Sequence, residues 1–62
     1  MKVRKALEIA IENETRSYEW YINQALEADD PETRLLFEQI AEEERLHLKK
    51  LNDRLKVLKL MD

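Results

Sequence analysis

Two glutamates and the single histidine of this 62-residue chain have the residue types and spacing of a metal site. Glu44 and His47 stand three residues apart, so on a helix their side chains share one face and can reach the same ion. Glu14 belongs to a separate segment and is likewise a carboxylate among apolar residues. Mixed carboxylate and imidazole ligands suit iron or manganese, and they also accept zinc.

Each of these three residues interrupts a stripe of apolar residues at helical spacing. A buried, ionised glutamate costs several kcal/mol unless it is paired or coordinated, which favours a ligand role for Glu14 and Glu44. A lone histidine beside an apolar face is more often a core or boundary residue, and this alternative stays open for His47. The first stripe comprises Val3, Leu7, Ala10, Glu14, Ser17, Tyr21 and Ala28, flanked by Ile11, Tyr18 and Ala25; the second comprises Phe37, Ile40, Glu44, His47, Leu51 and Leu58, flanked by Leu36, Ala41, Leu48 and Leu55.

The segment from Asp29 to Glu32 separates the two stripes. Asp30 suits a helix N-cap, Pro31 the first helical position, and Glu32 the positive end of the helix dipole. We therefore predict one all-α domain over residues 1–62, an antiparallel hairpin with helices at about 3–28 and 31–60 and a loop at 29–30. Counted from this loop, the three candidate ligands lie about 14 to 17 residues along their helices, within one turn of a common level.

Two helices cannot enclose these side chains, and a chain this short usually needs disulfides, metal or a partner. Disulfides are excluded because the chain has no cysteine. We predict a homodimer that closes both stripes into a four-helix bundle and doubles the ligands to four glutamates and two histidines. This is the ligand set of di-iron and di-manganese carboxylate bundles, with two metal ions shared between the chains.

The charges of the hairpin are polarised along its length. Basic residues gather at the open end and acidic residues near the loop, which predicts a dimer with its loops at opposite ends. The basic group comprises Lys2, Arg4, Lys5, Lys50, Arg54, Lys56 and Lys59, and the acidic group comprises Glu27, Asp29, Asp30, Glu32 and Glu38. A further apolar line at Leu35, Leu46 and Val57 indicates a higher oligomer.

Several classes of protein are disfavoured by the composition. The net charge of −3 argues against a general nucleic-acid binder. No apolar run approaches the length that spans a bilayer, and the N-terminus lacks the pattern of a signal peptide. We expect a cytoplasmic protein that binds neither membranes nor nucleic acid.

Two tyrosines stand near Glu14 on the same helix. Tyr21 lies two turns away and Tyr18 about one turn away. Either phenol can hydrogen-bond a ligating carboxylate, or it can simply pack as an aromatic ring.

Taken together, these motifs resemble those of the ferritin-like superfamily, specifically rubrerythrin-type domains and encapsulated ferritins. The resemblance runs from Ala6 to about Leu58. It is strongest at Asn13-Glu14, Trp20-Tyr21, Asp30-Pro31-Glu32 and residues 42–47. It implies a ferritin-like four-helix bundle in which Glu14, Glu44 and His47 ligate iron and Tyr21 lies near the metals.

Encapsulated ferritins are the nearer model, because they also use a single hairpin and complete the site by pairing chains. Asn13 and Arg16 stand where those proteins carry acidic residues that help iron to enter. The tail, residues 57–62, does not resemble a peptide that targets a protein shell, and the cysteine-rich electron-donor module of full rubrerythrins is missing.

The predicted function is oxidation of Fe(II) by dioxygen or peroxide at this shared site, a ferroxidase-type activity. Storage of the product would require a separate protein shell, as in encapsulin systems. One alternative is rubrerythrin-like reduction of peroxide. Another is a non-catalytic structural or adaptor dimer, in which the polar residues only fix the register of the helices.

Overall fold

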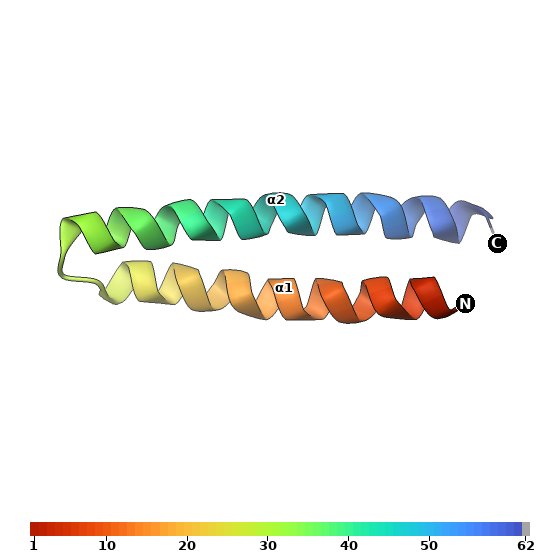
Figure 1. Ribbon diagram of the computed structural model, residues 1–62, viewed down its shortest axis with the longest axis horizontal. Coiled ribbons are helices and arrows are strands. Elements are labelled where there is room, and N and C mark those ends of the chain that lie inside the picture. The colour runs from red at the N-terminus through yellow and green to blue at the C-terminus, as the bar shows by residue number, and fades with distance from the viewer. Residues whose placement is uncertain (62) are drawn as a thin grey trace.

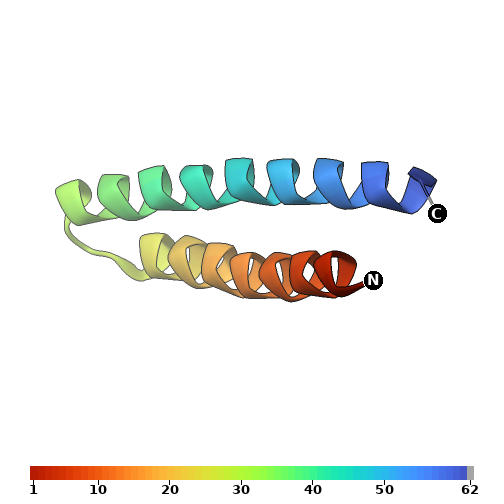
Figure 2. The ribbon, with the colours of Figure 1, turned by 45° about the vertical axis from the view of Figure 1, so that its right-hand side comes forward.

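Two helices joined by a short turn make up the fold. The computed structural model describes residues 1–61, in which α1 spans Lys2–Glu27 and α2 spans Pro31–Met61. The helices run antiparallel, and both chain ends lie at the end of the molecule opposite the turn (Figure 1). In the rotated view they cross at a shallow angle, as helices in bundles do (Figure 2). The predicted all-α hairpin is confirmed.

The turn at residues 28–30 is held by hydrogen bonds from the first turn of α2. Asp30 accepts a hydrogen bond at Oδ2 from the backbone N–H of Thr33, at 2.8 Å, and a second from the Thr33 hydroxyl. Both bonds, the hydroxyl bond more strongly, lower the pKa of the Asp30 carboxyl. The Arg34 guanidinium donates to the carbonyl of Ala28 at 2.8 Å and ties the end of α1 to the start of α2.

The helix boundaries differ from the predicted ones by a single residue. α1 begins at Lys2 instead of residue 3 and ends at Glu27 instead of 28, while α2 extends to Met61 instead of 60. Ala28 leaves the helix because its backbone is extended, with φ −67° and ψ 124°. Helix ends commonly differ by this much from a prediction based on sequence.

The buried residues of the seam are small towards one end of the hairpin and large towards the other. Ala25 and Ala41 are buried towards the loop end, where they allow close approach, and Leu55 and Leu58 are buried towards the open end. Val3 and Leu36, which we predicted within the buried stripes, are exposed at 53% and 51%. Their positions turn away from the seam towards a face that no other part of this hairpin covers.

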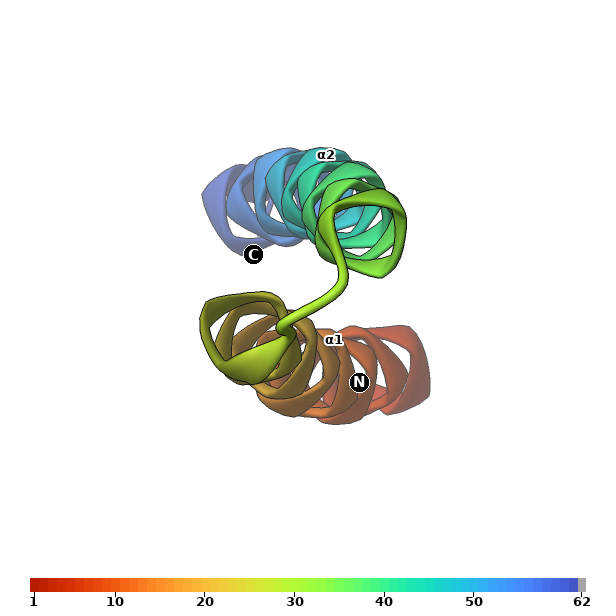
Figure 3. The same cartoon turned by 90° about the vertical axis from the view of Figure 1, so that its left-hand side faces the viewer.

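The hairpin exposes more surface than a compact domain of its size. Its accessible area is 4938 Å², against about 4,200 Å² expected for a compact monomer of this length. Its radius of gyration is 14.4 Å, against about 10.5 Å expected. The end-on view shows why, because the helices form a single layer with both broad faces uncovered (Figure 3). Over residues 1–61, neither helix is long and apolar enough to cross a membrane.

Candidate metal centre

Glu14, Glu44 and His47 come together at the middle of the hairpin. Each offers one ligand atom, and these three atoms all lie within 4.8 Å of one another. The Nδ1 atom of His47 lies 3.3 Å from Glu14 Oε2 and 3.4 Å from Glu44 Oε1. The antiparallel fold brings α1 and α2 level at this point, as the distances counted from the loop predicted.

The three side chains differ in burial. The Glu44 side chain is 15% exposed and that of Glu14 is 28% exposed, so both carboxylates are partly withdrawn from water. The His47 side chain is 54% exposed, which corrects the prediction that it lies in a buried stripe. His47 lies about 60° round α2 from Glu44, which turns its ring out of the seam towards solvent.

The donor set of this cluster fits a metal ion. Two carboxylates approach the same ring nitrogen, although one N–H can donate a good hydrogen bond to only one of them. Their separations of 3.3 and 3.4 Å exceed the roughly 2.7–2.9 Å of strong charge-assisted hydrogen bonds. A cation among these three atoms would satisfy both acids, and Glu and His are ligands that iron, manganese and zinc all accept.

A shallow hollow lies beside the cluster and gives access to it. Its lining combines ligands with polar and apolar neighbours, namely Ala10, Asn13, Glu14, His47, Lys50 and Leu51. From its charge, Lys50 is predicted to belong to the basic open end, and the sequence did not lead us to connect it with the site. Its position three residues after His47 is the signal that could have done so, because that spacing keeps both residues on one side of α2.

The tyrosines pack against other groups in the hairpin. The Tyr21 ring lies 5.1 Å from that of Trp20 and 6.0 Å from that of Phe37, measured between centroids. Tyr18 interacts electrostatically with Arg45, whose pKa is raised chiefly by its hydrogen bond to Glu42. The described contacts of Tyr21 are aromatic, and the predicted hydrogen bond from either phenol to a ligating carboxylate stays a prediction.

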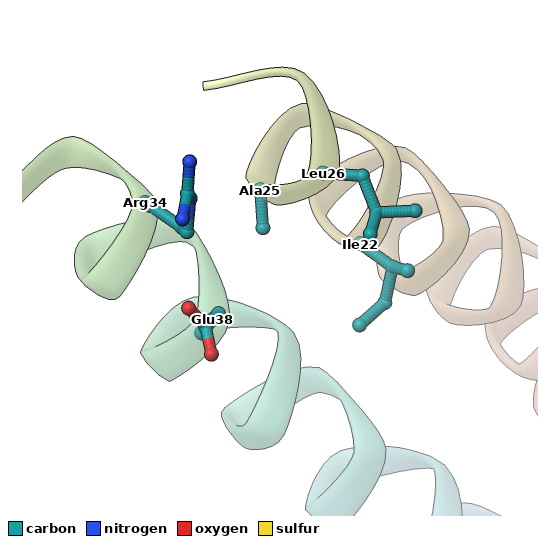
Figure 4. A pocket seen from close by; sticks show the side chains of 5 residues that line it. All are labelled: Ile22, Ala25, Leu26, Arg34 and Glu38. Atoms are coloured by element: carbon teal, nitrogen blue, oxygen red, sulfur yellow. The ribbon is translucent and has the colours of Figure 1, made fainter. Parts of the chain in front are cut away.

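A second hollow lies next to the turn, between the ends of the two helices. In Figure 4, α1 supplies its apolar wall and α2 its charged wall; the lining residues are Ile22, Ala25, Leu26, Arg34 and Glu38. Leu26 and Glu38 are each rotated by about 120° from the ligand on their own helix, which places this hollow on the other side of the seam. A single carboxylate and a guanidinium do not form a metal site.

Comparison with known proteins agrees with this geometry. The family model described as Rubrerythrin matches residues 1–60. The chain belongs to the rubrerythrin family. Membership indicates a ferritin-like, iron-binding role and iron-related redox chemistry.

A relative from Archaeoglobus fulgidus has nearly the same length as this rubrerythrin-family chain. It is described as an uncharacterized protein and is 43% identical over 61 residues, which are 98% of this chain and 95% of the relative. No solved structure gives a significant match to the chain.

Proposed function

We propose that two copies of this chain pair face to face, bind two iron ions through Glu14, Glu44 and His47 of both copies, and oxidise Fe(II) to Fe(III). One observation carries the proposal: these three side chains converge from both helices to within 4.8 Å, in a chain of the rubrerythrin family. Manganese or zinc would suit the same donors.

Charge supports two ions per dimer. Two copies of the cluster would supply four carboxylates and two imidazoles, and four ionised carboxylates balance the charge of two divalent ions. Because Glu14 and Glu44 are partly buried, their attraction for a cation is less screened than at an exposed surface site. The same carboxylates stabilise the product, since Fe(III) carries the higher charge.

The exposed surface of the hairpin supports the pairing. Large apolar side chains such as Val3, Trp20 and Leu36 are about half exposed, and the hairpin is one layer thick (Figure 3). A second copy laid on the face that carries His47 would cover these residues and add the ligands that a half-open cluster lacks. The opposite charges of the two ends favour loops at opposite ends of the dimer.

Iron is the substrate of the proposed reaction. Two Fe(II) ions each give up one electron, and dioxygen takes up both electrons with two protons to become hydrogen peroxide. The residues of the chain hold the two ions side by side, and the partly buried carboxylates stabilise the increase in positive charge as the ions are oxidised.

Anaerobic titration with Fe(II), followed by exposure to air, tests this function. We expect about one ion per chain and formation of Fe(III) on oxygenation. Glu44→Gln removes a negative ligand with little change of shape and should abolish binding, whereas the neighbouring and exposed Glu43→Gln should bind as the unaltered protein does. Failure of the unaltered chain to bind Fe(II) would refute the proposal.

Membership of the rubrerythrin family favours one alternative, in which hydrogen peroxide is the physiological oxidant. Peroxide then accepts the two electrons and two protons and becomes two molecules of water. Stopped-flow oxidation of the Fe(II)-loaded protein distinguishes the two functions. A rate with peroxide at least tenfold above that with dioxygen at equal concentration would favour peroxide reduction.

A structural or adaptor dimer is the non-catalytic alternative. The polar cluster would then only fix the register of the helices, as buried polar groups do in some coiled coils. In that case Fe(II) and chelators would leave the melting temperature unchanged, and Glu14→Ala would leave it unchanged or raise it. Storage of oxidised iron would need a surrounding protein shell, which co-expression with a shell protein can test.

A further inference from the structure

Three aromatic rings near the loop end form a cluster that the metal chemistry does not use. The ring of Trp20 meets those of Tyr21 and Phe37 edge-on, with centroids 5.1 and 6.1 Å apart. Trp20 is nevertheless 53% exposed. A large aromatic side chain left half in water, with ordered neighbours on one side, has the character of an interface anchor.

An apolar hollow that could receive an aromatic ring lies near the open end. Its lining is mostly aliphatic, with one guanidinium, and comprises Val3, Ala6, Leu7, Arg54 and Leu58. Leu58 is buried while Val3 is exposed, so the hollow has an apolar floor and an accessible rim. The small side chain of Ala6 leaves room that a larger ring can fill.

The cluster and the hollow stand at equal distances on either side of the metal centre. On α1, Tyr21 lies seven residues from Glu14 towards the loop, and Leu7 lies seven residues from it towards the open end. On α2, Phe37 lies seven residues before Glu44, and Arg54 lies seven residues after His47. Seven residues are two turns, about 10.5 Å along the axis, and return a side chain to nearly the same face.

This symmetry matters for the dimer of the proposed function, on which the inference rests. If a two-fold axis crosses the metal centre and places the loops at opposite ends, the aromatic cluster of one copy comes level with the open-end hollow of the other. If the loops lie at the same end, rings face rings and hollow faces hollow, which leaves a void at the open end. Voids forfeit packing contacts and are unfavourable in an interface.

Charge favours the same arrangement. Arg54 at the hollow would face the rings of Trp20 and Phe37, where a guanidinium gains from the electron-rich aromatic face. The surrounding lysines and arginines of the open end would meet the acidic residues of the loop end. With the loops at the same end, each charged end would instead face its like.

We infer that the aromatic cluster of one copy packs into the open-end hollow of a second copy, twice in each dimer, and that this contact sets the orientation of the two hairpins. The partner is therefore a second copy of this chain. The contact needs no metal. It positions the two half-sites and takes no part in the oxidation of iron.

Dissociation of the metal-free protein tests the contact. In EDTA, Trp20→Ala should weaken the dimer about tenfold or more, as truncation of an interface anchor does. Leu26→Ala is the control, because Leu26 is also an exposed large apolar residue but lines the hollow beside the turn, on the other side of the seam, and it should change the dissociation constant by no more than about twofold. Equal effects of the two substitutions, or a metal-free chain that is monomeric at all concentrations, would overturn the inference.

The orientation can be read from the emission of Trp20, the only tryptophan. The chain lacks cysteine, so an acceptor dye can be placed at the exposed Glu8→Cys, outside the hollow, or at Asp29→Cys, in a chain that also carries Trp20→Phe. In mixed dimers with the unlabelled protein, a dye at position 8 should quench Trp20 strongly and a dye at position 29 weakly. The reverse order would overturn the inference.

These outcomes are separate from those of the iron proposal. Fe(II) titration reports on Glu14, Glu44 and His47, whereas both tests of the contact are done without metal. A dimer with the expected orientation that binds no Fe(II) would remove the proposed function and leave the contact intact. Binding of Fe(II) with no effect of Trp20→Ala on dissociation would remove the contact and leave the proposed function intact.

Discussion

Carboxylates occur in two different settings on this hairpin. On the exposed surface, ion pairs join residues three or four apart on one helix, as in Arg16–Glu12, Arg45–Glu42 and Lys49–Asp53, at 2.6–2.9 Å. The candidate metal centre instead joins Glu14 on α1 to His47 on α2, 33 residues further along the chain, and the carboxylates there are partly buried.

The difference shows which carboxylates are available for a metal. Each of these three surface acids, Glu12, Glu42 and Asp53, has a basic partner on its own helix, and the pKa of Glu42 is lowered because Arg45 donates hydrogen bonds to it. Glu14 and Glu44 approach one imidazole between them. A surface acid meets its counter-charge three or four residues away on the same helix, whereas Glu14 and Glu44 are brought together by the fold and would need a cation to balance both charges.

The largest effect is expected when one acid is removed from each setting and the affinities for Fe(II) are compared. Glu14→Gln should lower the affinity for Fe(II) by at least about 100-fold, because it removes a charged ligand from each half-site. Glu12→Gln, which breaks the ion pair with Arg16 two residues away, should change the affinity by less than about twofold. Isothermal titration under anaerobic conditions measures both. Similar losses in the two variants would show that iron binds by general charge.

Metal binding should raise the melting temperature only when the acids of the candidate metal centre are intact. A ligand that binds only the folded state at 100 times its dissociation constant adds about 2.7 kcal/mol. We therefore expect Mn(II), used as an air-stable probe, to raise the melting temperature by several degrees in the unaltered protein and in Glu12→Gln. In Glu14→Gln the rise should vanish. A rise that persists in Glu14→Gln would place the ion elsewhere.

Acid should affect the local carboxylates in a defined direction. The folded pKa of Asp30 is lowered by its bonds to Thr33, so its stabilising contribution is present above the unfolded pKa and is lost as the pH falls through the folded pKa. Asp30→Asn keeps a capping side chain without the charge and should lose less stability on acidification than the unaltered protein does. Thermal melts between neutral and strongly acidic pH measure this. An identical acid response of both proteins would contradict the prediction.

The smallest effect is expected at the surface pairs. Arg45→Gln removes the partner of Glu42, but exposed ion pairs of this spacing contribute little and are screened by salt. The melting temperature should shift by no more than about one degree, and the difference should vanish in high salt. A larger shift that persists in salt would mean that Arg45 supports the metal centre, for example through Tyr18.

Much of this structure follows from local sequence signals. The consecutive residues Asp30, Pro31 and Glu32 predict the start of α2, which begins at Pro31. The backbone N–H of Thr33 donates to Asp30, as expected for an N-cap. Equal distances from the turn then bring Glu14 level with Glu44 and His47, because helices have a fixed rise per residue. The meeting of the three side chains was therefore predictable from counting.

Other features depend on how the helices rotate against each other. Whether Val3, Leu36 and His47 face the seam or the open side is a matter of a few tens of degrees, which periodicity does not resolve. The nearness of Lys50 to the centre and the hollow beside the turn arise from the same rotation. In the proposed dimer, burial of the exposed stripe residues would also depend on the second chain, which a single sequence does not describe.

The positions of the two chain ends have a consequence for joining two hairpins in one polypeptide. Both ends lie together, away from the turn (Figure 1), and the hairpin is 48 Å long. In a dimer with opposed loops, the C-terminus of one copy and the N-terminus of the other lie at opposite ends of the bundle. A fused tandem would then need a connection of about 15 extended residues to run the length of the bundle. A shorter connection would force the two copies into the wrong orientation or into separate molecules.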